Sequence, residues 1–302
     1  MKYHTPALLN ESIEGLNIHP DGVYVDATFG GGGHSRTILE RLTTGRLIAL
    51  DYDADALANA PDDKRLITER GNFRFLRNYL AHHGYRKVDG ILVDLGVSSH
   101  HFDEAGRGFS FRYDDAPLDM RMNTAAQLTA KAVLNQYPDD SLRYIFAEYG
   151  EISDAPRLAR QIVTARREKP IERSGQLIEA IGRCIPRGSE NKYLAKVFQS
   201  LRIEVNSELE NLKALLMQSV SLLQQGGRLV VIAYQSLEDR LVKNFFKNGM
   251  FEGSAEKDVY GNVNVPFRPV NNRAIAPTEE EIAANSRSRS AKLRIGERIV
   301  NI

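Results

Sequence analysis

The chain contains very little cysteine and no long apolar run, and each absence excludes a class of protein. Its 302 residues include one cysteine, Cys184, which excludes an internal disulfide and a zinc site built from cysteines. No run of about 18 apolar residues occurs, so no transmembrane helix is expected. The opening residues, MKYHTPALLNESIEG, lack the apolar core of a signal peptide. We therefore expect a cytoplasmic protein with no membrane partner.

Net charge is also nearly absent, but its distribution along the chain is uneven. The formal net charge is +1, yet residues 157–202 hold eleven Lys and Arg against four Glu, an excess of seven. The rest of the chain is therefore about six negative. A positive segment on a near-neutral protein suits binding to a phosphate backbone. A solvated, arginine-rich helix face explains the charge equally well.

The apolar segments indicate a sheet of parallel strands covered by helices. Strand-like segments at 22–28, 45–53, 65–73, 88–96 and 227–235 alternate with helical patterns. About 130 residues separate the last two of these segments, which is too long for a crossover connection. Helical patterns fill residues 129–196, so we predict an inserted helical domain at 108–207. Residues 1–107 and 208–302 would form the α/β domain around it.

A run of four glycines follows the first predicted strand. The stretch YVDATFGGGGHS covers residues 24–35, and a helical pattern comes after it. Glycine has no Cβ and adopts positive φ at little cost, so a loop of this kind lets the backbone approach a ligand closely. Strand, glycine loop and helix in this order are typical of the entry to a nucleotide-binding α/β unit. A plain tight turn is the alternative.

Three aspartates end predicted strands, where ligands bind in open α/β sheets. Asp51 suits a ribose diol, which dinucleotides and S-adenosylmethionine share. Asp26 and Asp94 would repel a pyrophosphate but suit the ammonium and sulfonium of S-adenosylmethionine. Ser35 also stands where the third glycine of G-x-G-x-x-G would fall. The sequence therefore favours methyl transfer over hydride transfer, with a nicotinamide oxidoreductase and a non-catalytic RNA-binding protein as alternatives.

Seven motifs extend this interpretation along nearly the whole chain. They are DATFGGGGHS (26–35), DLGVSS (94–99), RGFSF (107–111), PLDMRM (117–122), FQSLRIEVNSEL (198–209), SLEDR (236–240) and SRSAKLR (288–294). With these motifs the sequence resembles the bacterial 16S ribosomal RNA cytosine-N4 methyltransferases. The resemblance implies a Rossmann-like class I methyltransferase with a parallel-rich sheet and an inserted α-helical substrate domain. It also implies N4-methylation of a cytosine in the P-site region of the small subunit.

The same resemblance implies an S-adenosylmethionine site and no metal. Its contacts would be Gly32, Gly33, His34, Asp51, Phe73 and Asp94, with His101 as a further donor. Family members usually have glutamine at the position of His101, and they tend to have histidine where this chain has Gln235. Because the cytosine amine is conjugated into its ring, the site needs an acceptor for one N–H group. Asp94 is our candidate for this catalytic role.

Candidate RNA contacts come from the loop at 107–122 and from the basic segment. The loop alternates arginines with aromatic residues, which suits stacking on unpaired bases and contact with phosphates. Packing of the insertion against the rest of the protein is the alternative. The predicted substrate contacts are Arg107, Phe109, Arg121, Arg166, Arg167, Arg202 and Asn206. Oligomeric state stays open between monomer and homodimer.

Three smaller features complete the sequence-based picture. The tail SRSRSAKLR at 286–294 is predicted to contact phosphates. An apolar stripe that includes Leu201, Val205 and Leu209 predicts a helix through this region that ends at Gly226 and Gly227. Ser236 and Asp239 are predicted to form the cap of the following helix.

Overall fold

The computed structural model describes residues 6–96, 105–253 and 265–299. The chain divides into two compact units, which we call the α/β unit (Met1–Gly96 with Leu209–Ile302) and the helical unit (Val97–Glu208). Arg107 therefore belongs to the helical unit, although we had expected it in the α/β domain. The reason is local, because the carbonyl of Arg107 accepts a hydrogen bond from the Met120 amide at 3.0 Å.

The α/β unit contains a seven-stranded sheet in the order β3-β2-β1-β4-β5-β7-β6. Its strands are β1 (Val23–Asp26), β2 (Arg46–Asp51), β3 (Leu66–Arg70), β4 (Val88–Asp94), β5 (Leu223–Ala233), β6 (Phe267–Pro269) and β7 (Lys292–Arg298). Strands β1 to β5 pair in parallel, and β7 pairs antiparallel with both of its neighbours. The five predicted strands and the Rossmann-like class I fold are confirmed.

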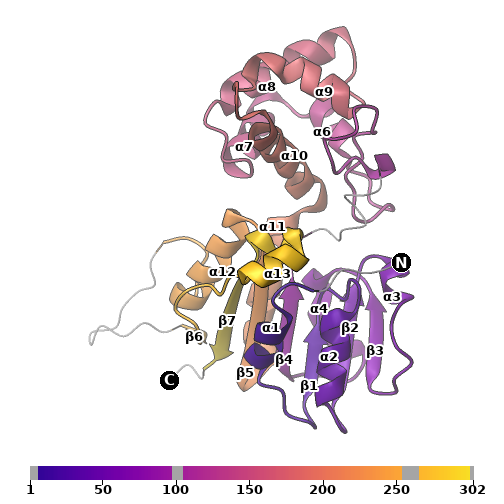
Figure 1. Cartoon of the computed structure of the whole chain (residues 1–302), viewed down its shortest axis with the longest axis vertical. Coiled ribbons are helices and arrows are strands. Elements are labelled where there is room, and N and C mark those ends of the chain that lie inside the picture. Colours follow the sequence, from indigo (N-terminus) through magenta and orange to yellow (C-terminus); the bar gives the residue numbers. More distant parts are fainter. Residues whose placement is uncertain (1–5, 97–104, 254–264, 300–302) are drawn as a thin grey trace. The chain divides into compact units, whose positions relative to one another are not determined.

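Helices cover both faces of this sheet (Figure 1). Helices α1 (Leu9–Leu16) and α2 (Gly33–Arg41) pack on the face that includes Tyr24 and Leu47. The opposite face, which includes Val25 and Ile48, is covered by α4 (Leu76–His82), α11 (Glu208–Leu222) and α12 (Ser236–Asn248). Shorter elements are α3 (Ala54–Leu57), η1 (Phe73–Phe75), α13 (Glu279–Ala284) and η4 (Ser286–Ser290). Strands buried on both faces explain the nearly continuous apolar runs in the sequence.

The helical unit has an apolar core of its own. It contains α6 (Ala130–Gln136), α7 (Asp139–Glu148), α8 (Ala155–Glu168), α9 (Ser174–Ile181) and α10 (Glu190–Asn206), with short turns η2 (Ala105–Arg107) and η3 (Gly182–Cys184). Cys184 is buried in this core, as expected for a small apolar side chain. Among the described residues, no helix is long and apolar enough to cross a membrane.

The return from the helical unit differs from the single helix that we predicted. Helix α10 ends at Asn206, Ser207 adopts a left-handed conformation with φ of 51°, and α11 begins at Glu208. A left-handed residue ends a helix because its backbone turns away from the helical path. The apolar stripe continues across this break, which explains why the sequence pattern did not reveal it.

Candidate active site

The glycine loop lies between β1 and α2, so the predicted order of strand, loop and helix is confirmed. Gly30 and Gly32 have positive φ values of 52° and 74°. A Cβ at Gly32 would lie 2.6 Å from the Phe29 ring, and one at Gly33 would lie 2.4 Å from Pro6. Contacts this short would force the chain to shift, so positions 32 and 33 require glycine for conformation or space.

Asp51 joins the end of β2 to this glycine loop. Its Oδ2 atom accepts a hydrogen bond from the Gly30 amide at 2.7 Å, and Oδ1 accepts one from the Asp53 amide at 2.9 Å. Burial raises the pKa of Asp51. Because a carboxylate oxygen can accept more than one hydrogen bond, Asp51 can support the loop and still accept a ribose hydroxyl.

Asp26 lies beneath the loop and does not face a ligand, which corrects our expectation from the sequence. Its side chain is fully buried. The Ser35 hydroxyl donates to Oδ2 at 2.6 Å, and the Thr28 amide donates to Oδ1 at 3.2 Å. Burial raises the pKa of Asp26 to about 7. Asp26 therefore fixes the two ends of the loop from inside the fold.

Asp94 stands at the end of β4, and the structure supplies it with a partner that the sequence analysis missed. The Tyr234 hydroxyl donates to Oδ1 of Asp94 at 2.9 Å, and the Asp94 amide donates to the Thr28 hydroxyl at 2.7 Å. Burial raises the pKa of Asp94 to about 7, while the Tyr234 hydrogen bond opposes this shift. Tyr234 directly follows β5. A polar side chain at the end of an apolar strand was the feature of the sequence that could have revealed this partner.

His34 and Phe73 also lie on elements that border the glycine loop and the strand ends. His34 is buried, and this burial lowers its pKa to about 4, so the imidazole is neutral at neutral pH. Its Nε2 atom has no hydrogen-bond partner among the residues that the structure describes. Phe73 begins η1 just after β3, is half-buried and packs on the α4 face. His101 lies outside the described residues.

These residues bring carboxylates to the ends of three neighbouring strands, β1, β2 and β4. The strand order reverses between β1 and β4, which is the position where ligands bind in doubly wound sheets. Asp51, as an acceptor for a diol, and Asp94, as a second carboxylate, suit a ligand that carries positive charge and a ribose, while Asp26 supports the loop from beneath. They do not suit a pyrophosphate, which they would repel.

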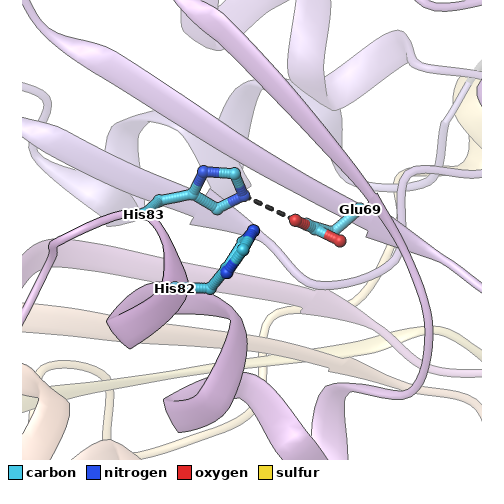
Figure 2. Close-up of side chains that lie close together, drawn as sticks. All are labelled: Glu69, His82 and His83. Carbon is cyan, nitrogen blue, oxygen red and sulfur yellow. Dashed lines mark hydrogen bonds and ion pairs between the residues drawn. The ribbon is translucent and has the colours of Figure 1, made fainter.

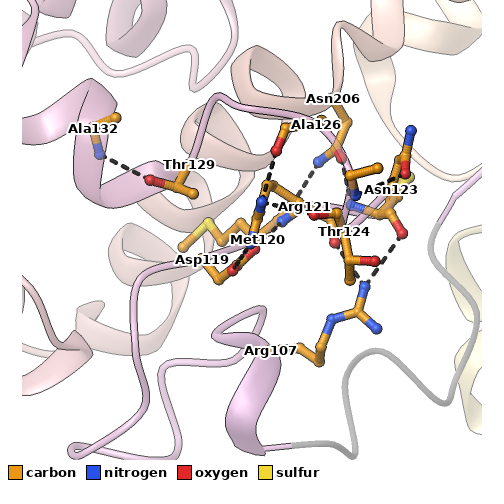
Figure 3. A network of polar contacts seen from close by, with 12 residues as sticks. Arg107, Asp119, Met120, Arg121, Asn123, Thr124, Ala126, Thr129, Ala132 and Asn206 are labelled. Carbon is orange, nitrogen blue, oxygen red and sulfur yellow. Dashed lines mark hydrogen bonds and ion pairs between the residues drawn. The ribbon is translucent and has the colours of Figure 1, made fainter.

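The helical unit gives internal partners to most of the predicted substrate contacts (Figure 3). Arg107 donates to the Arg121 carbonyl at 2.7 Å, and Arg121 forms a two-pronged ion pair with Asp119 at 2.9 and 2.7 Å. Asn206 accepts from the Met122 amide at 2.7 Å and donates to the Met120 carbonyl at 2.8 Å. These three side chains therefore stabilise the loop at 107–122 from within.

The remaining predicted contacts divide into internal and exposed groups. Arg202 pairs with Glu208 at 2.8 Å, both nearly buried, and Arg166 donates to the Leu134 carbonyl at 2.7 Å. Phe109 is 4% exposed and belongs to the core, so its place in the structure is that of a packing residue. Only Arg167 of the seven is well exposed. Contact of any of them with RNA stays a prediction.

Exposed basic residues nevertheless gather on the helical unit. Six residues of the 157–202 segment are exposed, and their side chains form no hydrogen bond or ion pair with the described part of the chain: Arg160, Arg167, Lys169, Arg183, Arg187 and Lys192. Arg160 and Arg167 lie seven residues apart on α8 and therefore share a face. This pair is a better probe of phosphate binding than Arg166 with Arg167.

The motif SLEDR (236–240) and the tail at 286–294 form more contacts within the fold than we expected from the sequence. Helix α12 is capped at Gln235, not at Ser236, and the Glu238 carboxylate accepts from the Gln235 amide at 3.1 Å. Asp239 instead pairs with Arg294 at 2.6 Å. Because β7 begins at Lys292, part of the predicted phosphate-binding tail is a strand of the sheet. We missed this strand because charged residues alternate along it.

Comparison with known proteins decides the family. Residues 1–299 match the model of the MraW methylase family. The chain belongs to the MraW methylase family. Relatives in this family include the ribosomal RNA small subunit methyltransferases H of Parabacteroides distasonis, 55% identical, and Flavobacterium johnsoniae, 53% identical. The first alignment covers 98% of both chains and the second covers 99% of both.

Distant similarity to solved structures was also found. An rRNA methylase from Streptococcus thermophilus is 11% identical, with a TM-score of 0.42 over 97% of this chain and 94% of the other. A similarity of this size does not bear on the chemistry of the site. The assignment of the fold therefore rests on the sheet order and on the family.

Proposed function

We propose that the chain is an S-adenosylmethionine-dependent methyltransferase that N4-methylates a cytosine of 16S ribosomal RNA in the P-site region of the small subunit. The observation that carries this proposal is the placement of Asp51 and Asp94 at the ends of β2 and β4, beside a glycine loop that Asp26 supports from beneath. Family membership supports the methylase activity, and the names of the relatives support small-subunit ribosomal RNA as the substrate. The position of the target base follows the resemblance noted from the sequence motifs.

The residues present fit the cofactor. Asp51 would accept hydrogen bonds from the ribose, and Gly32 and Gly33 would let the backbone approach the ligand closely. The unpartnered Nε2 atom of buried His34 is a polar atom that a ligand group or a small loop adjustment would satisfy. Phe73 would border the adenine. S-adenosylmethionine supplies an activated methyl group, and no residue of this set needs a metal.

Asp94 would act on the target amine. Tyr234 occupies its Oδ1 atom, which leaves Oδ2 to accept an N–H group of cytosine and orient the nitrogen lone pair. After attack, the methylated nitrogen carries an extra proton, and a carboxylate with a pKa near 7 can receive it. Tyr234 would hold the carboxylate in the orientation needed for this transfer, and would act as a positioning residue.

The proposed reaction predicts a specific product on a specific particle. Tritiated methyl transfer should be much faster on small subunits from a methylation-deficient strain than on naked RNA or DNA, since a structured particle presents one splayed-out base. After digestion the label should migrate with N4-methylcytidine. Label in 5-methylcytidine would contradict the proposal, because that reaction needs a cysteine nucleophile and Cys184 is buried in the helical unit.

The exposed arginines of α8 should supply part of the affinity for RNA. Replacing Arg160 and Arg167 together with alanine should reduce the slope of log affinity against log salt by about one to two units, because two phosphate contacts are lost. Filter binding across a salt series measures this slope. The matched control is Lys243→Ala with Lys247→Ala, two exposed residues of α12. Equal slopes in wild type and the arginine variant would show that these two arginines only face solvent and do not contact phosphates.

The two alternative functions are separated by binding experiments. An oxidoreductase would bind NAD and not S-adenosylmethionine in calorimetric titration. A non-catalytic RNA-binding protein would keep its RNA affinity and show no methyl transfer to any ribosomal particle.

A further inference from the structure

Two histidines and a glutamate meet at the edge of the α/β sheet, in residues that the proposed reaction does not use. Glu69 projects from β3, which is one of the two edge strands of the sheet. His82 is the last residue of α4, and His83 caps the same helix. One possible ligand atom from each residue lies within 4.8 Å of the other two. Figure 2 shows both imidazole rings beside the Glu69 carboxylate.

An ordinary ion pair explains only part of this arrangement. His83 Nε2 lies 2.5 Å from Glu69 Oε1, so these two groups already satisfy one another. His82 has no such explanation, since it is exposed and yet its ring stands edge-on to His83 with centroids 5.0 Å apart. Two imidazoles and one carboxylate, all possible metal ligands, therefore lie together, although one imidazole and the carboxylate would be enough for an ion pair. No other group of this kind occurs within the described part of the chain.

The donor set selects the class of ion. Calcium and magnesium prefer sites made wholly of oxygen, so two imidazoles argue against them. Two histidines and one carboxylate are a common ligand set for zinc, and a three-residue site keeps a coordination position for water. The exposure of His82 leaves space for that water. Cobalt and nickel share the same preference for imidazole.

The geometry points to a binding site for a divalent transition metal, with zinc as the expected ion, formed by Glu69, His82 and His83. The ion would replace the direct contact between Glu69 and His83 and connect the edge strand β3 to the end of α4. Helix α4 follows directly after η1, which carries Phe73. The bound ion would therefore stabilise the segment that leads from the end of β3 to α4.

Zinc titration of the full-length chain, free of any histidine tag and stripped with a chelator, tests the site. Calorimetry should show one equivalent of zinc bound by the wild type. His82→Ala and Glu69→Gln should each weaken binding by at least about tenfold, since even residues that merely orient a metal ligand contribute about 10- to 100-fold. Both variants should fold, because His82 is exposed and glutamine can still accept the hydrogen bond from His83.

Two controls make the result specific to this cluster. His19→Ala changes an exposed histidine elsewhere, and His100→Ala with His101→Ala changes the other adjacent pair in the sequence. Neither should alter zinc affinity. Zinc should also raise the melting temperature of the wild type but not of His82→Ala. The inference is overturned if the wild type binds no zinc, if the cluster variants bind it unchanged, or if only the His100 and His101 variant loses it.

Discussion

Replacing Asp94 with alanine is expected to lower the rate of methyl transfer by about 10²- to 10⁴-fold, the usual contribution of a positioned proton acceptor. Asp94→Asn should also be slow, because a neutral amide can accept a hydrogen bond but cannot take up the proton. Single-turnover transfer to small subunits measures both rates. A rate in Asp94→Asn near that of the wild type would show that Asp94 serves as a hydrogen-bond acceptor and not as a base.

The pH profile distinguishes a role in proton transfer from a structural one. The pKa of Asp94 is raised to about 7, and only its ionised form can accept a proton, so wild-type activity should rise as the pH increases through about 7. The Tyr234 hydrogen bond stabilises this ionised form. In Tyr234→Phe the pKa of Asp94 should therefore rise, and the acidic limb of the profile should move to higher pH. A lower rate with an unmoved limb would contradict the positioning role of Tyr234.

Replacing Asp51 with alanine is expected to weaken S-adenosylmethionine binding by about 10- to 150-fold. This range corresponds to about 1.5–3 kcal/mol for hydrogen bonds to a charged acceptor. The structure adds a second cause, because the variant also loses the hydrogen bonds from the Gly30 and Asp53 amides. Calorimetric titration with the cofactor, or with its demethylated product, measures the change.

Asp55 provides the matched control for this experiment. It is an exposed aspartate four residues further along, at the start of α3. Asp55→Ala removes the same charge from the same region without touching the glycine loop, so cofactor affinity should stay within about twofold of wild type, as for a screened surface charge. Unchanged affinity in a folded Asp51→Ala protein would remove the ribose contact from the proposal.

The sequence by itself determined the sheet, the inserted helices and the place of the glycine loop. These features depend on local patterns, namely apolar runs, helical periodicity and glycines that a short turn requires. The positions of Asp51 and Asp94 at the strand ends could also be predicted, because the carboxyl ends of parallel strands lie at one edge of the sheet. The motifs identified the family for the same reason, since each is a continuous stretch of chain.

Only the tertiary structure decided which polar side chains are free to act. Arg121, Arg202 and Asn206 look like RNA contacts in sequence, yet each has an internal partner. Tyr234 reaches Asp94 across 140 positions of sequence, and Glu69 meets His83 from a different element. These contacts depend on burial and on pairing between residues far apart in the chain. Neither can be recognised from neighbouring residues, because the sequence does not show whether a charged side chain faces water or another residue.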